Sequence, residues 1–146
     1  MLSKKAKYGL KAIIYLAKQE PDRYFQISEI ADEEHIPQKF LEAILLELKK
    51  NTILFSLRGK NGGYKLAKTP AEISVGSVIR MIDGPLAMIP CVSKLYYQRC
   101  DECIDEKTCE IRHIMQEVRD ATTNILDNTS LEALIHGGGA VDTLTL

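Results

Sequence analysis

All four cysteines of this 146-residue chain lie close together in its second half. Their spacing is Cys91-x8-Cys100-x2-Cys103-x5-Cys109, and His113 follows the last of them. Thiolates bind zinc and iron–sulfur clusters. Zinc ribbons and fingers usually contain two closely spaced pairs of ligands, whereas this segment contains one. The residues alone leave four alternatives open: an iron–sulfur cluster, structural zinc, a thiol–disulfide switch, and unmodified thiols beside an interaction surface.

No other group of residues in the sequence predicts catalysis. The glycines of residues 59–63 lack the strand-then-helix context of a nucleotide-binding loop. The three histidines show no spacing typical of a catalytic base beside a nucleophile; they are His35, His113 and His136. We therefore expect a binding protein and not an enzyme.

The charges are unevenly distributed along the chain. Residues 1–70 contain 13 Lys and Arg against 8 Asp and Glu, whereas residues 71–146 contain 6 against 12. A basic first half predicts binding to a polyanion.

Clustered cysteines are typical of metal or redox sites in a reducing compartment. No apolar run approaches the roughly 20 residues of a membrane span, so we expect a cytoplasmic protein with no membrane partner.

Three helices are predicted in the first half, over residues 3–19, Ser28–Glu34 and Pro37–Lys50, because apolar residues recur there at helical spacing. In the third, the expected buried face consists of Phe40, Leu41, Ile44, Leu45 and Leu48. The expected outer face consists of Gln38, Lys39, Glu42, Ala43 and Lys49. Two short helices joined by a tight turn, the second with a polar outer face, are typical of a helix-turn-helix.

A β-hairpin is predicted directly after these helices. Residues 53–57 and 64–66 are strand-like, and the turn between them is rich in glycine, which permits positive φ and close backbone approach. Arg58, Lys60 and Lys65 place positive charge around its tip. A hairpin with a cationic tip after a helix-turn-helix predicts a wing that reaches the minor groove of DNA. The alternative is an ordinary hairpin with solubilising charge.

Several segments, in this order, resemble the Rrf-two family of bacterial winged-helix regulators over roughly residues 2–135. They are Lys7–Leu10, Ile27–Ala31, Phe40–Leu45, Ser56–Leu66, Ile73–Arg80 and Asp83–Leu86. The Arg-Gly-x-x-Gly-Gly-Tyr sequence of the wing is the most specific of these signals. The family includes regulators of iron–sulfur status, nitric-oxide response and cysteine metabolism.

The resemblance implies a mainly α fold with a small β-hairpin: a winged helix-turn-helix DNA-binding domain plus a long dimerisation helix. We expect a DNA-binding region over residues 1–84 and a cysteine-containing sensor loop over residues 85–107, called the cysteine loop below. A dimerisation helix and a short last helix are expected over residues 108–136, with a flexible tail over residues 137–146. The implied partners are a second copy of the chain and double-stranded DNA with an inverted-repeat operator.

The resemblance also favours an iron–sulfur cluster, 2Fe–2S rather than 4Fe–4S, with zinc as the alternative. Family members that bind a cluster place three cysteines in this loop, which correspond to Cys91, Cys103 and Cys109. Cys100 is additional and is the simplest fourth ligand, although it could instead be a redox partner. The iron–sulfur regulators place a histidine where this chain has Arg112, and the nitric-oxide sensors use a carboxylate of the first helix, which here has no acid before Glu20. A regulator controlled by a partner protein remains the second functional class.

The predicted DNA contacts are of two kinds. In the major groove, the residues near base edges would be Gln38, Lys39, Glu42 and Ala43. Arg58 of the wing would reach the minor groove, and Lys60 of the wing is also expected to bind DNA. Phosphate contacts are expected from Lys4, Lys7 and Lys11 of the first helix.

The long helix is predicted over residues 108–126, with Ile114, Val118, Ala121 and Ile125 facing the partner chain. A capping box of Thr129 and Glu132 is expected to begin the last helix, and the glycines of residues 137–139 are expected to end it.

Overall fold

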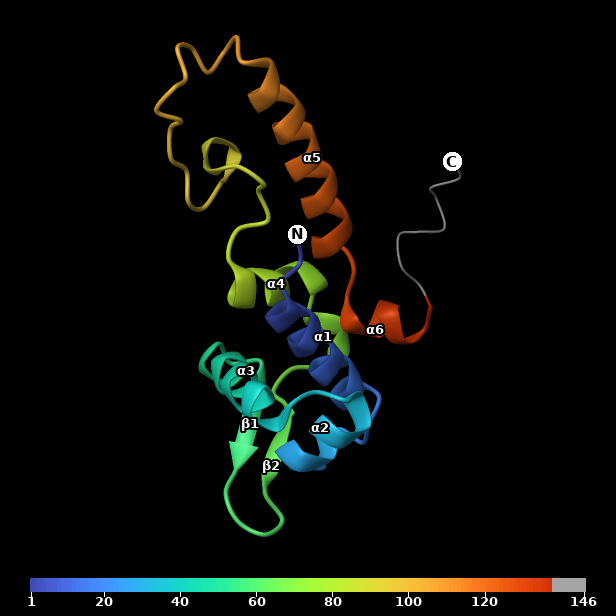
Figure 1. Ribbon diagram of the computed structural model, residues 1–146. Helices are drawn as coiled ribbons and strands as arrows, with labels where there is room; N and C mark the ends of the chain where they lie inside the picture. The colour runs from blue at the N-terminus through green and yellow to red at the C-terminus, as the bar shows by residue number, and fades with distance from the viewer. Residues whose placement is uncertain (138–146) are drawn as a thin grey trace.

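The computed structural model describes residues 1–137, which form a packed head and an arm that extends from it (Figure 1). The head contains helices α1 (Lys4–Ala17), α2 (Ile27–Glu34), α3 (Gln38–Lys50), α4 (Val75–Asp83) and α6 (Leu131–Ile135), and strands β1 (Leu54–Leu57) and β2 (Gly63–Leu66). A short 3-10 helix, η1 (Pro70–Glu72), joins β2 to α4. The arm contains the cysteine loop, with a second 3-10 helix η2 (Pro90–Val92), and the long helix α5 (Glu110–Asp127). The mainly α fold with one hairpin is as predicted.

The core of the head is formed where the helices meet. Its fully buried side chains include Ile13 of α1, Ile30 of α2, Leu41 and Leu45 of α3, and Val78 of α4. Burial of such apolar surface is the main force that stabilises the fold. The turn between α2 and α3 is tight, because His35 adopts a left-handed conformation with φ of 53°. This arrangement is the predicted helix-turn-helix.

The hairpin is antiparallel, with Leu54 opposite Leu66 and Leu57 opposite Gly63. An isolated bridge between Phe25 and Tyr64 attaches β2 to the segment before α2. Gly63 has φ of +137°, and a Cβ there would lie 2.1 Å from the carbonyl oxygen of Phe25. Only glycine therefore lets the hairpin approach the body of the head this closely.

The last helix differs in detail from the prediction. Ser130, and not Thr129, caps α6, since the Ser130 side chain accepts a hydrogen bond from the amide of Ala133. The Thr129 hydroxyl instead donates to the carbonyl of Ile125 at 2.7 Å, so the predicted capping box is wrong by one residue. Leu131 is completely buried in the core of the head, so α6 packs there and not on the arm. The expected tail after Gly137 lies outside the described residues.

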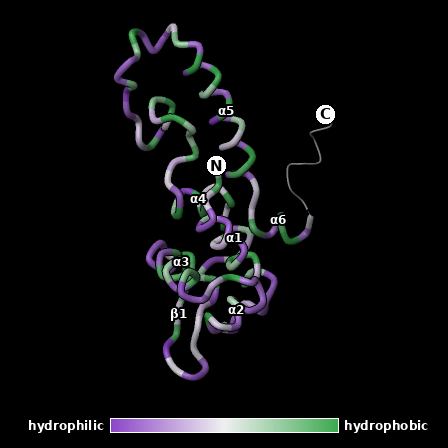
Figure 2. Tube along the Cα trace, in the orientation of Figure 1, coloured by the Kyte–Doolittle hydropathy of each residue, from purple (hydrophilic) through white to green (hydrophobic). Residues whose placement is uncertain are grey.

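Helix α5 packs mainly against α4 and η2, and none of its residues is buried. Hydrophobic residues nevertheless recur along it (Figure 2). Ile111, Ile114 and Ile125 are 66%, 49% and 37% exposed. An 18-residue helix with an uncovered apolar face is unusual for a chain that functions alone.

Candidate functional site

The outer face of α3 is available for a ligand. Gln38, Lys39, Glu42 and Ala43 are all exposed, as predicted, while Leu41, Ile44, Leu45 and Leu48 are buried beneath them. Phe40 was predicted to be buried but is 46% exposed. Its ring makes an edge-on contact with Tyr8 of α1, with centroids 5.7 Å apart. The core under α3 is already filled by the leucines and isoleucine, so Phe40 packs at the border between α1 and α3.

Leu46 is a second apolar residue on the exposed surface of α3, and it is 46% exposed. The sequence analysis missed it, although it lies three and four residues after Ala43 and Glu42 and so shares their face of the helix. Apolar side chains at such positions contact thymine methyl groups in the major groove.

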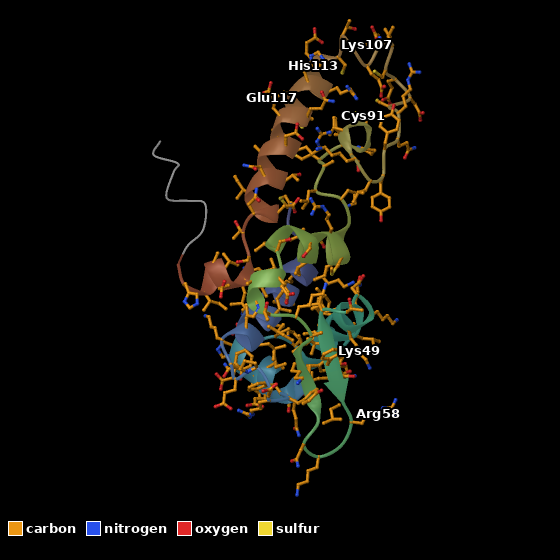
Figure 3. The ribbon with its side chains drawn as sticks, turned by 180° about the vertical axis from the view of Figure 1, so that it is seen from behind. Lys49, Arg58, Cys91, Lys107, His113 and Glu117 are labelled. Atoms are coloured by element: carbon orange, nitrogen blue, oxygen red, sulfur yellow. The ribbon has the colours of Figure 1, made fainter. Side chains whose placement is uncertain are left out.

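The wing projects from the same end of the head as the outer face of α3. Lys49 of α3 and Arg58 of the wing lie at this end of the molecule, whereas Cys91, Lys107 and His113 lie at the other (Figure 3). Arg58 and Lys60 are exposed. The Gln26 side chain donates a hydrogen bond to the Lys60 carbonyl at 2.9 Å, which ties the tip of the wing to the start of α2. The helix-turn-helix and the wing thus form one connected surface.

The lysines of α1 fall into two groups. Lys4 and Lys7 are exposed and form no ion pair with any residue of the described chain. Lys11, by contrast, donates to the carbonyl of Glu34 at the end of α2, and its Nζ lies 3.7 Å from the Glu34 carboxylate. A cation at this position stabilises a helix C-terminus. Lys11 is therefore engaged within the head, and Lys4 and Lys7 are the lysines free to meet a phosphate.

The four cysteines are brought together in the arm. Cys91, Cys100, Cys103 and Cys109 all line one surface cavity of about 410 Å³, called the cysteine cavity below. The cavity lies between the cysteine loop and the first turn of α5. His113 is exposed and does not line it. The cysteines are widely spaced in the sequence, but all four line this one cavity.

Each thiol has a distinct environment. Cys91 is buried, with an exposed fraction of 8%. Cys109 caps α5, and its sulfur accepts a hydrogen bond from the amide of Arg112 at 3.4 Å. The Cys100 thiol lies 3.1 Å from the Glu102 carboxylate, and this hydrogen bond raises the pKa of Cys100. Partial burial, followed by the neighbouring Cys109, raises the pKa of Cys103.

The four cysteine thiols fit an iron–sulfur cluster better than a single metal ion. Four thiols around one cavity are the ligands that iron–sulfur clusters require. Yet within residues 1–137 no three side chains of His, Cys, Asp or Glu are gathered closely enough to hold one metal ion. A cluster binds its cysteines through separate iron atoms, so its ligands need not converge on one point. Cys91, Cys100, Cys103 and Cys109 are the residues that could hold it.

The part of the chain that the structure describes contains no helix long and apolar enough to cross a membrane.

Comparisons with known proteins agree with this architecture. Residues 2–137 match the model of the Rrf2 family, described as an iron-dependent transcriptional regulator. An rrf2-like HTH-type transcriptional regulator of Rhodobacter capsulatus is 40% identical over 141 residues, which cover 94% of each chain. The HTH-type transcriptional regulator NsrR of Oceanobacillus iheyensis is 30% identical, over 92% of this chain and 88% of that protein.

Among solved structures, the global cysteine regulator CymR of B. subtilis superposes with a TM-score of 0.77. It is 28% identical, and the match covers 94% of this chain and 97% of that one. The family match spans both the head and the arm, and the relatives are regulators of transcription and not enzymes. The chain therefore belongs to the Rrf2 (Rrf-two) family of DNA-binding transcriptional regulators.

Proposed function

We propose that this protein binds its operator as a homodimer and that an iron–sulfur cluster in the cysteine cavity controls its affinity for DNA. The observation that carries the proposal is the convergence of all four thiols on one cavity beside the start of α5. Cys91, which lines this cavity, and Arg58 of the wing lie toward opposite ends of the molecule (Figure 3). Control must therefore act through the structure between them.

The DNA-binding part of the proposal rests on the exposed face of α3 and the wing. Gln38, Lys39, Glu42 and Ala43 would read base edges in the major groove, where Glu42 can accept from a cytosine amino group. Arg58, with Lys60 beside it, would enter the minor groove, whose negative potential attracts arginine. The exposed lysines Lys4 and Lys7 would contact phosphates, which fixes the orientation of the head on the duplex.

The dimer is proposed from the uncovered face of α5. Ile114, Ala121 and Ile125 are exposed, and Val118 is half-buried. Arg112, Arg119 and Asp127 lie on the other side of the helix, toward the cysteine loop and the head. One face of α5 is thus occupied within the chain, and the apolar face is left for a second copy. A symmetric dimer would present two wings and two α3 helices to an inverted repeat.

The coupling between cavity and head would pass through η2 and α5. Cys91 lies within η2, and the carbonyl of the next residue, Val92, accepts a hydrogen bond from Arg119 of α5 at 2.6 Å. The last residue of α5, Asp127, binds Arg80 of α4 in the head. A bound cluster would order the cysteine loop and the first turn of α5, and its loss would release them. Such an order–disorder change could alter the relative orientation of two heads in a dimer.

A second candidate is control by thiol oxidation without a metal. It is favoured by the positions of Cys103 and Cys109, which line the same cavity, Cys103 on the cysteine loop and Cys109 at the start of α5. Oxidation of two thiols to a disulfide would need an external oxidant and would fix the start of α5 to the loop.

The iron, sulfide and zinc content of anaerobically purified protein distinguishes these two candidates. The proposal predicts iron and sulfide, with a visible charge-transfer spectrum, and their loss when Cys91, Cys103 or Cys109 is replaced by alanine. Cys100→Ala should retain a cluster with an altered spectrum if another donor replaces the thiol. Stoichiometric zinc without sulfide would contradict the cluster and indicate a structural site. A metal-free protein whose operator affinity changes with oxidation would instead support the thiol switch.

A further inference from the structure

Arg112 is the one residue of the cysteine cavity with a buried polar atom that lacks a partner. Its Nε is buried and forms no hydrogen bond, and it is the only such side-chain nitrogen or oxygen among residues 1–137. The rest of the side chain is not sealed off, since 22% of it is exposed. Leaving a buried donor unpaired is energetically unfavourable. An unpaired buried donor on a residue that lines a cavity suggests an acceptor that binds in the cavity.

The acidic residue nearest to this nitrogen does not serve as that acceptor. The Glu106 carboxylate lies 4.0 Å from Arg112 Nε, which is beyond hydrogen-bond distance. Glu106 is already bound by the Tyr97 hydroxyl at 2.6 Å. The guanidinium of Arg112 is thus positioned by α5 and by a weak ion pair while its Nε–H remains free.

The chemistry of the cavity identifies the missing acceptor as an anion. Four thiolates around a 2Fe–2S core carry a net negative charge, and the carboxylates of Glu102 and Asp105 also line the cavity. A guanidinium is the only cationic group among the lining residues. The amide of Arg112 already donates to the sulfur of Cys109, and Arg112 and Cys109 line the same cavity.

We propose that Arg112 is a positioning residue for the cluster, whose Nε–H donates to an anionic sulfur of the bound cluster or of a cysteine that holds it. This inference rests on the proposed function, because it requires a cluster in the cysteine cavity. A positive charge and a hydrogen bond to sulfur favour the reduced cluster, which carries one more negative charge, and so raise its reduction potential. Partners of this kind typically change metal affinity by about 10- to 100-fold when they are removed.

The test compares anaerobic wild type with Arg112→Gln and Arg112→Lys. The control is Arg99→Gln, which removes the same charge from the neighbouring cysteine loop. Arg99 is exposed and binds only the carbonyls of Cys103 and Ile104. The readouts are the midpoint potential of the cluster in a dye-mediated titration and the rate of iron loss to a chelator.

Arg112→Gln should lower the midpoint potential and speed iron loss by about 10-fold or more, while Arg99→Gln should change both much less, because Arg99 is exposed. The midpoint potential of Arg112→Lys should lie between those of Arg112→Gln and wild type, because lysine keeps the positive charge but lacks the Nε–H. If Arg112→Gln does not fold, Arg112→Lys provides the test, because it should lose iron faster than wild type. Equal potentials and iron-loss rates in the Arg112 and Arg99 variants would overturn the role of Arg112 alone. Wild type without iron and sulfide would overturn the cluster itself.

Discussion

Arg80 of α4 and Asp127 of α5 form a bidentate ion pair, with nitrogen–oxygen distances of 2.6 and 2.9 Å. The hydrogen bonds from the guanidinium to Asp127 raise the pKa of Arg80. Directly beside this pair, the backbone amides of Val75 and Leu131 donate to the carbonyls of Thr129 and Ile73, each at 2.9 Å. The end of α5 is therefore joined to the head by side chains and backbone together. In the proposed function, this junction would transmit a change in the arm to the head.

The first prediction concerns the close contact at this junction. A Cβ on Gly76 would lie 2.1 Å from Oδ1 of Asp127. Overpacking in Gly76→Ala should cost about 1–3 kcal/mol. The higher helix propensity of alanine should offset about 1 kcal/mol of this cost, so we expect a net destabilisation of up to about 2 kcal/mol. Urea unfolding measures the change. Adding Asp127→Ala to Gly76→Ala should relieve part of this cost, because it removes the clashing carboxylate. A Gly76→Ala protein that is more stable than wild type would contradict this geometry.

The second prediction concerns the link between α5 and the cysteine loop. Arg119 is largely buried and donates to the Val92 carbonyl, and Val92 is only 2% exposed. Arg119→Met keeps the apolar stem but leaves the carbonyl unpaired. In metal-free protein, Cys91 should then react faster with an alkylating agent, as measured by mass spectrometry. Arg99→Met is the matched control, and unchanged protection of Cys91 in the Arg119 variant would show that this bond does not hold η2.

The third prediction concerns the dimer. Val118→Asp would bury an unpaired charge in the proposed interface, which is strongly unfavourable. Sedimentation should show monomers, and operator binding should be lost. Asn124→Asp is the matched control, because it adds the same charge to an exposed position beside the apolar face. A folded Val118→Asp protein that still sediments as a dimer would place the interface elsewhere.

The fourth prediction concerns the wing. Arg58→Ala should weaken operator binding by about 1–3 kcal/mol, since it removes a minor-groove contact. Lys68→Ala removes an exposed positive charge outside the wing and should have a much smaller effect. Fluorescence anisotropy at one fixed salt concentration measures both. Equal affinities of the two variants would mean that the hairpin does not enter the groove.

The fifth prediction separates the lysines of α1. Lys7→Ala should reduce the slope of log affinity against log salt by about 0.9, as expected for one lost phosphate contact. Lys11→Ala should leave the slope unchanged and lower stability instead, because Lys11 binds the end of α2. Salt titrations and urea unfolding of both variants provide the comparison. A reduced salt slope in Lys11→Ala would show that its contact with Glu34 gives way to DNA.

Much of the head could be predicted from local sequence patterns. The spacing of Leu41, Ile44 and Leu48 defines the buried face of α3, and the glycines after Arg58 define the turn of the wing. Phe40 was misplaced because its neighbour Tyr8 belongs to another helix, and periodicity in one helix contains no information about the next. The capping residue of α6 was misplaced because Thr129 and Ser130 are chemically similar, and tertiary contacts with α5 decide between them.

The cysteine cavity could be predicted less completely. The number and clustering of the thiols indicated a site, but their convergence depends on an irregular loop that has no periodic pattern. Nothing in the sequence showed that Arg112 would have an unpaired Nε, since this follows from the position of Glu106 relative to α5. The same is true of the bond between Arg119 and Val92, which joins residues 27 positions apart.

The most direct test of the account is the operator affinity of one protein preparation with and without its cluster. Operators can be selected from random duplexes with both forms, and affinities measured anaerobically at one salt concentration. Removal of iron should change the operator affinity of wild type by about 5- to 150-fold, the usual range of allosteric coupling. Cys103→Ala should show the affinity of the iron-free form under both conditions. Equal affinities of the loaded and iron-free wild type would contradict control by the cysteine cavity.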